Sequence, residues 1–246
     1  MVPEVDAQVA EDEPAVEEFQ KAFARIEAAL DAGDVRVGML GYWMLLRQVK
    51  AEFALSQHWA EQVGRIDRKL FERQVLLRFP VWLGNAVLLL GLALGGAAVV
   101  LGRRASDEAL SGLAFVVAAV AWSVAVHDLA HWLVGRWAGI RFIAYFFKRQ
   151  FPPRPGIKTD YATYLRAEPA MRAWMHASGA LATKAAPFAV LGFIGGSNAP
   201  AWAFWAVLAI GLFQIFTDVR FSTKSSDWMK VRRELAAARG QFARGR

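Results

Sequence analysis

The chain has 246 residues, a net charge of +7 and an apolar fraction of 56%. Soluble domains are about 45–50% apolar, so this composition fits neither an ordinary soluble domain nor a disordered chain. The sequence contains no cysteine. That absence excludes disulfides, cysteine-ligated zinc, iron–sulfur clusters and thiol nucleophiles.

The N-terminal segment, residues 1–79, is predicted to form a helical hairpin after about 13 loose residues. Apolar residues recur at helical spacing from Val16 to Leu30, and a second helical pattern fills the rest of the segment. The first helix is acidic, since residues 1–34 have a net charge of −8. We expect this hairpin in the cytosol, where it could bind a protein partner, and its sequence pattern indicates no chemistry.

Three long stretches with at most one charged residue follow the hairpin. About 20 apolar residues span a bilayer, and Gly195-Gly196-Ser197-Asn198-Ala199-Pro200 divides the last stretch in two. The sequence therefore predicts an all-α, polytopic membrane core over residues 80–235, followed by a basic tail at 236–246. The four membrane helices are predicted at about residues 80–101, 109–135, 175–195 and 200–219.

Lysine and arginine cluster before the first predicted membrane helix, between the second and third, and after the fourth. The only basic residues in the other two loops are Arg103 and Arg104. Basic segments favour the cytosolic side, so we expect a multi-pass protein of the plasma or inner membrane with both termini in the cytosol. The positive charge thus indicates how the chain is oriented in the membrane. We expect the lipid bilayer, and not nucleic acid, as its partner. Pro152-Pro153-Arg154-Pro155-Gly156 predicts an irregular loop over residues 136–172, with room for short strands.

Three ionisable residues lie inside the second predicted membrane helix: His127, Asp128 and His131. Histidines at positions i and i+4 share one face of a helix and can bind one metal ion. Ionisable groups inside a membrane are costly and commonly mark a functional site. The alternative interpretation is two histidines at the membrane interface, with the aspartate paired to a nearby arginine.

The segment from His127 to Ile140 resembles the zinc helix, with its His-Glu-x-x-His motif, of the site-2 protease family of intramembrane metalloproteases. Gly179-Ala180-Leu181-Ala182-Thr183 is similar to the family's Gly-Pro-Leu-Ala-Asn stretch. The run from Thr217 to Trp228 stands where the family has its late Asn-x-x-Pro…Asp-Gly motif. The resemblance covers about residues 109–235 and does not extend to the N-terminal hairpin.

The resemblance implies a Zn²⁺ ion held by His127, His131 and an aspartate of the third motif. Asp227 fits the order and spacing of that motif, although its position is also typical of a helix N-cap. Asp218 has the better predicted depth, at the end of the fourth membrane helix. His176, at the start of the third membrane helix, is a further candidate ligand or a residue that stabilises an oxyanion.

Asp128 stands where the family has glutamate, and the resemblance assigns it the role of catalytic acid–base. Aspartate is shorter by one methylene, and a misplacement of about 1 Å can cost about a hundredfold in rate. The expected function is an intramembrane zinc metalloprotease that hydrolyses a peptide bond of a membrane-anchored protein substrate near the cytosolic face. The alternative is a catalytically weak or inactive metal-binding pseudoprotease that acts as a membrane scaffold or regulatory adaptor.

Overall fold

The computed structural model describes residues 13–34, 36–149, 155–220 and 226–244, so the loose start expected for the first residues lies almost entirely outside the described part. Within the described residues there are ten helices and three strands. Four of the helices are long and apolar enough to cross a membrane. The chain is therefore an all-α, multi-pass membrane protein with one small sheet, and its fold divides into two compact units.

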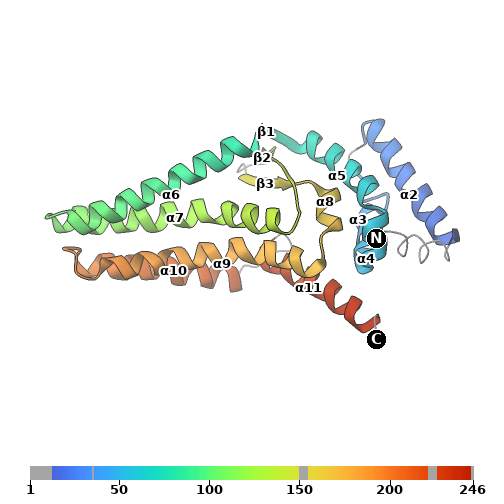
Figure 1. The fold of residues 1–246 in the computed structure, drawn as a ribbon. Coiled ribbons are helices and arrows are strands. Elements are labelled where there is room, and N and C mark those ends of the chain that lie inside the picture. The colour runs from blue at the N-terminus through green and yellow to red at the C-terminus, as the bar shows by residue number, and fades with distance from the viewer. Residues whose placement is uncertain (1–12, 35, 150–154, 221–225, 245–246) are drawn as a thin grey trace. The chain divides into compact units, whose positions relative to one another are not determined.

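The first unit comprises the described parts of Phe79–Gly135 and Ala173–Arg233. It contains most of the four membrane helices, which lie side by side (Figure 1): α6 (Val81–Arg104), α7 (Glu108–Trp137), α9 (Pro169–Ile194) and α10 (Ala201–Arg220). All four were predicted, and three begin and end within about three residues of the expected bounds. Helix α9 begins six residues earlier than expected, because Pro169 is favourable at a first helical position and Arg172 is helical despite its charge.

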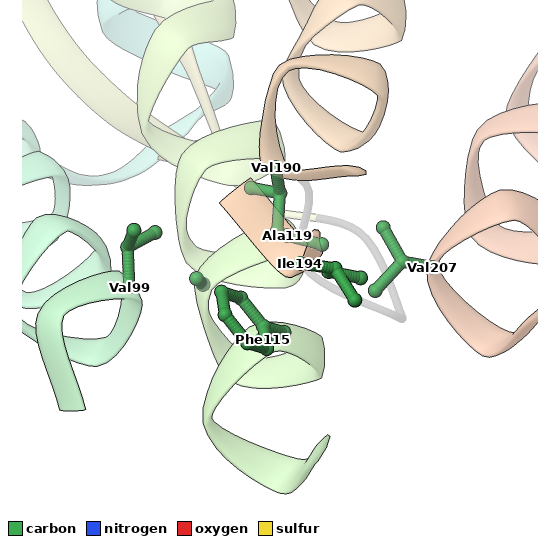
Figure 2. Packing of buried hydrophobic residues seen from close by; sticks show 7 residues of the cluster. Val99, Phe115, Ala119, Val190, Ile194 and Val207 are labelled. Atoms are coloured by element: carbon green, nitrogen blue, oxygen red, sulfur yellow. The ribbon is translucent and has the colours of Figure 1, made fainter. Parts of the chain in front are cut away.

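One apolar cluster joins these four helices (Figure 2). It consists of Val99 from α6, Phe115, Ala118 and Ala119 from α7, Val190 and Ile194 from α9, and Val207 from α10. Small residues let the helices approach closely, as at Gly102, where a Cβ atom would lie 2.9 Å from the Phe115 ring. On the outer surface, Leu94 is 59% exposed and Phe213 is 66% exposed. Such apolar side chains are stable there because a bilayer covers them.

The second unit comprises the described parts of Met1–Arg78, Arg136–Arg172 and Glu234–Arg246. Its helices are α2 (Glu13–Asp31), α3 (Tyr42–Ala51), α4 (Phe53–His58), α5 (Ala60–Gln74) and α8 (Tyr161–Arg166). The predicted apolar faces are buried: Phe23, Ile26 and Leu30 on α2 and Val63 and Ile66 on α5 are at most 1% exposed. The second arm of the predicted hairpin, however, is three helices and a strand instead of one continuous helix.

Strands β1 (Val75–Phe79), β2 (Phe142–Lys148) and β3 (Pro155–Thr159) form a sheet in the order β1-β2-β3. Strands β2 and β3 are antiparallel, with Tyr145 opposite Ile157. The segment predicted as an irregular loop therefore has the short strands for which its sequence left room, and the prediction missed the helix α8. The prediction of helix through residues 75–79 was wrong. Pro80 disfavours helical geometry at the preceding residue, and β2 supplies the hydrogen-bonding edge that an extended segment needs. Helix α11 (Asp227–Arg244) continues into the residues expected to form a basic tail.

Candidate metal centre

Three side chains from two helices of the first unit converge on one point. His127 and His131 lie one turn apart on α7, and Asp227 is the first residue of α11. The Nε2 atom of His127 lies 3.4 Å from Oδ2 of Asp227, and Nε2 of His131 lies 3.3 Å from the same oxygen. The ligand atoms of the three residues all lie within 4.8 Å of one another, so this group could hold a metal ion.

A backbone carbonyl orients the His131 ring. Nδ1 of His131 lies 2.6 Å from the carbonyl oxygen of Met175 on α9. A carbonyl oxygen can only accept a hydrogen bond, so Nδ1 bears the hydrogen and Nε2 is left with a lone pair. The ring is buried, at 7% exposure, which restricts it to this orientation. The nitrogen suited to metal binding therefore faces Asp227.

A threonine hydroxyl orients the His127 ring in the same sense. Nδ1 of His127 lies 2.9 Å from Oγ1 of Thr183, also on α9. The Thr183 hydroxyl donates its single hydrogen to the carbonyl oxygen of Gly179, at 2.9 Å. It must then accept a hydrogen bond from Nδ1 of His127, which leaves Nε2 of this ring with a lone pair as well. Such outer contacts orient the ligands of metal sites and raise their basicity.

The chemistry of these donors fits a cation. Two Nε2 lone pairs and one carboxylate oxygen meet at the same point, and three acceptors in contact repel one another unless a proton or a metal ion lies between them. Two neutral imidazoles and a carboxylate are a known ligand set for zinc, with a fourth position open for water. The absence of cysteine from the sequence leaves nitrogen and oxygen as the available donors, apart from methionine sulfur.

The remaining contacts of Asp227 hold its carboxylate ionised. Nζ of Lys230 lies 2.8 Å from Oδ1, the oxygen that does not face the two histidines. Burial by itself would raise the pKa of Asp227, but where a proton instead of a metal ion lies between its carboxylate and His127 or His131, the resulting hydrogen bond outweighs burial and holds that pKa well below its usual range. The N-cap interpretation of Asp227 was wrong, because Oγ of Ser226 accepts the hydrogen bond from the Met229 backbone N–H.

Asp128 lies beside this group. Its Oδ1 is 4.0 Å from Nε2 of His127, and its side chain is 23% exposed. It is not one of the three residues whose ligand atoms converge. A carboxylate at this distance can accept a proton from a water molecule placed between the two histidines, directly or after a small side-chain rotation.

The two alternative ligands have other surroundings. Asp218 forms an ion pair with Lys184 and accepts a hydrogen bond from the Trp228 indole N–H at 3.1 Å, so its carboxylate is engaged away from the histidines. His176 lies nearer, with Nδ1 3.8 Å from Oδ1 of Asp227. That oxygen is the one that contacts Lys230, and the other oxygen, Oδ2, faces His127 and His131.

Sequence reasoning did not identify the residues that orient the two histidines. Thr183 and the Met175 carbonyl both come from α9, more than 40 residues further along the chain. The only sequence signal was Gly179-x-x-x-Thr183, whose spacing of four places both residues on one face of α9. A backbone carbonyl leaves no sequence signal of this kind.

No family model, no curated protein and no solved structure matches this chain. The fold and the site define the class: a multi-pass membrane protein with a histidine, histidine and aspartate group that could bind a metal ion.

Proposed function

We propose that the protein is an intramembrane zinc metalloprotease of the site-2 protease type. The observation that supports this most directly is the convergence of Nε2 of His127, Nε2 of His131 and the Asp227 carboxylate at one point of a helix long enough to span a membrane. The ligand set, with a position left for water, is that of catalytic zinc sites. The resemblance of the motif around His127 to the family's zinc helix supports the same assignment.

The proposed reaction is hydrolysis of a peptide bond. Bound zinc would supply a Lewis acid that polarises the scissile carbonyl and makes water more acidic. Asp128 accepts a proton from the attacking water as the new carbon–oxygen bond forms, and it then gives that proton to the leaving amine as the carbon–nitrogen bond breaks. His127 and His131 keep their orientation through Thr183 and the Met175 carbonyl.

The proposed substrate is a membrane-anchored protein, cleaved near the cytosolic face. His127 and His131 lie in the C-terminal half of α7, which ends at Trp137 just before the basic segment that we place in the cytosol. Water would reach the site from that side. The group that could hold a metal ion lies outside the N-terminal helices. These helices are proposed to bind a protein partner.

One observation favours a second function, that of a metal-binding pseudoprotease used as a scaffold or adaptor. The acid beside the ligands is an aspartate, and its nearest oxygen is 4.0 Å from Nε2 of His127. If this shorter side chain fails to reach the water, the metal would stabilise the fold without supporting rapid hydrolysis.

The proposal is tested first by metal content. The full chain is purified in detergent with chelator-washed buffers, and metals are measured by plasma mass spectrometry. We expect about one zinc per chain, and loss of that zinc in His127→Ala and in Asp227→Ala. His58→Ala is the matched control, because His58 is exposed on α4 in the other unit. Wild-type protein without bound metal, or equal metal in all variants, would contradict the metal site.

The second measurement is cleavage. A panel of single-span reporter proteins with helix-breaking residues near the cytosolic end is reconstituted with the purified protein, and fragments are identified by mass spectrometry. Zinc-dependent cleavage that disappears in His127→Ala supports the protease. Zinc binding with no cleavage of any reporter, in membranes where a known intramembrane protease cleaves them, favours the pseudoprotease.

A further inference from the structure

The second unit contains a small basic pocket where α5 packs against α8. It has a volume of about 240 Å³, and four of its nine lining residues are arginines: Arg65, Arg68, Arg141 and Arg166. Gly64 allows the two helices to meet here, since a Cβ atom at this position would lie 2.9 Å from the Cβ of Ala162. The close approach brings arginines from α5, from the end of α8 and from the loop before β2 around one hollow.

The acidic residues of the pocket are already engaged. Oε1 of Glu61 forms an ion pair with Arg166 at 2.8 Å. Oδ1 of Asp160 accepts a hydrogen bond from the backbone N–H of Ala162 and so caps α8. Two carboxylates among four guanidinium groups leave two positive charges in excess.

Glu27 from outside the lining offsets part of this excess, and among the described residues Arg68 and Arg141 are the lining arginines without a carboxylate partner. Arg65 reaches Glu27, with Nε 3.6 Å from Oε1. In the described part of the chain, no carboxylate lies within ion-pair distance of Arg68 or Arg141. Both side chains are exposed at the pocket, where their donors are available to a ligand. Guanidinium groups match the oxygens of phosphate in pairs, which makes arginine the preferred residue for such anions.

We propose that this pocket binds a phosphate-bearing anion, either the phosphate of an anionic lipid headgroup or free phosphate. The pocket volume is sufficient for one phosphate group and its waters. Arg141 follows Trp137, the last residue of membrane helix α7, by four residues, a chain length that spans at most about 14 Å. Arg166 precedes Pro169, the first residue of α9, by three residues. Lipid headgroups at the membrane surface are therefore within reach, and basic pockets beside membrane helices are suited to them.

The experiment measures binding of three soluble probes to the full chain in detergent by isothermal titration calorimetry. The probes are inorganic phosphate, dihexanoyl phosphatidic acid and dihexanoyl phosphatidylcholine. Arg68→Gln combined with Arg141→Gln is expected to weaken binding of the phosphate probes at least tenfold, because hydrogen bonds to charged groups contribute about tenfold or more each. The matched control is Arg25→Gln combined with Arg47→Gln, which removes the same charge from exposed positions on α2 and α3 outside the pocket.

The Glu61→Gln variant tests whether the arginines of the pocket bind a ligand or only form ion pairs within the protein. This change removes a negative charge from the pocket and releases Arg166, so binding should become several-fold tighter. Binding of both inorganic phosphate and phosphatidic acid supports a site for phosphate in general, and binding of phosphatidic acid alone supports a headgroup site. The proposal is overturned if neither inorganic phosphate nor phosphatidic acid binds at millimolar concentration, if the zwitterionic phosphatidylcholine binds as well as phosphatidic acid, or if the pocket and control variants lose affinity to the same extent.

Discussion

Gly179 on α9 provides the space that the His131 ring on α7 occupies. A Cβ atom at position 179 would lie 2.3 Å from Nε2 of His131, which is far inside van der Waals contact. The same segment of α9 supplies the carbonyl oxygen that Thr183 uses and the hydroxyl that orients His127. The geometry of the metal ligands therefore depends on the close packing of α7 against α9.

Gly179→Ala should release the metal without unfolding the protein. The added methyl group would push the His131 ring away from Asp227, and we expect zinc affinity to fall at least a hundredfold. Gly192→Ala is the control on the same helix, because nothing lies within 4 Å of a Cβ there. Competition with a fluorescent zinc chelator measures both affinities, and equal values would show that His131 can move without leaving the site.

Thr183→Val should weaken metal binding by a smaller factor. The substitution keeps the shape of the side chain but removes the oxygen that accepts from Nδ1 of His127. Loss of an outer contact of this kind commonly costs about 10–100-fold in metal affinity. Thr183→Ser retains the hydroxyl and should bind zinc nearly as the wild type does. If the serine and valine variants behave alike, the hydrogen bond does not orient His127.

Asp128 variants distinguish the two proposed functions. In a protease that uses this carboxylate as acid–base, Asp128→Asn should retain zinc but lose cleavage by about 100-fold or more. Asp128→Glu places the acid closer to the position of the water, so a weak enzyme should become faster. Cleavage rates of a reconstituted reporter at matched zinc occupancy measure this. An asparagine variant as active as the wild type would exclude Asp128 as the base.

The second unit contains a buried ionic cluster whose loss should destabilise it. Arg172 and Glu234 are 0% and 1% exposed, with Nε and Oε2 3.0 Å apart. Glu234 also accepts a hydrogen bond from the Tyr164 hydroxyl at 2.8 Å and pairs with Lys50. The carboxylate therefore balances two cations at once.

Glu234→Ala should lower the free energy of unfolding by about 3–5 kcal/mol, because it leaves the Arg172 guanidinium buried without its counter-charge. Glu17→Ala breaks an exposed pair with Lys21 on α2 and should change stability little. Urea unfolding in detergent, followed by tryptophan fluorescence, compares the two. Similar midpoints for both variants would contradict an energetic role for the buried pair.

The proposed orientation is open to a direct test, since the chain has no native cysteine to interfere with labelling. Ser106→Cys lies exposed in the turn between α6 and α7, and Gln48→Cys lies exposed on α3. With an impermeant maleimide on intact cells, we expect the cysteine at position 106 to be labelled. The cysteine at position 48 should react only after permeabilisation. The reverse pattern would show that the basic segments face outward.

Local patterns in the sequence were enough to predict the membrane helices and the histidine pair. Uncharged runs of about 20 residues define spans regardless of what they pack against. A spacing of four puts His127 and His131 on one face because the helix repeat is fixed. The same reasoning failed at residues 75–79, where a hydrogen-bonding partner in β2 makes an apolar run extended.

Only the tertiary structure decided which carboxylate meets the histidines. Asp218 and Asp227 are nine residues apart, and by sequence both were candidate metal ligands. In the structure, Lys184 on α9 pairs with Asp218, while Asp227 at the start of α11 faces His131 on α7. The same holds for the arginine pocket, whose members lie up to about a hundred residues apart in the sequence. Contacts of this kind depend on how helices pack, and packing is set by the shapes of many side chains together, which no local repeat encodes.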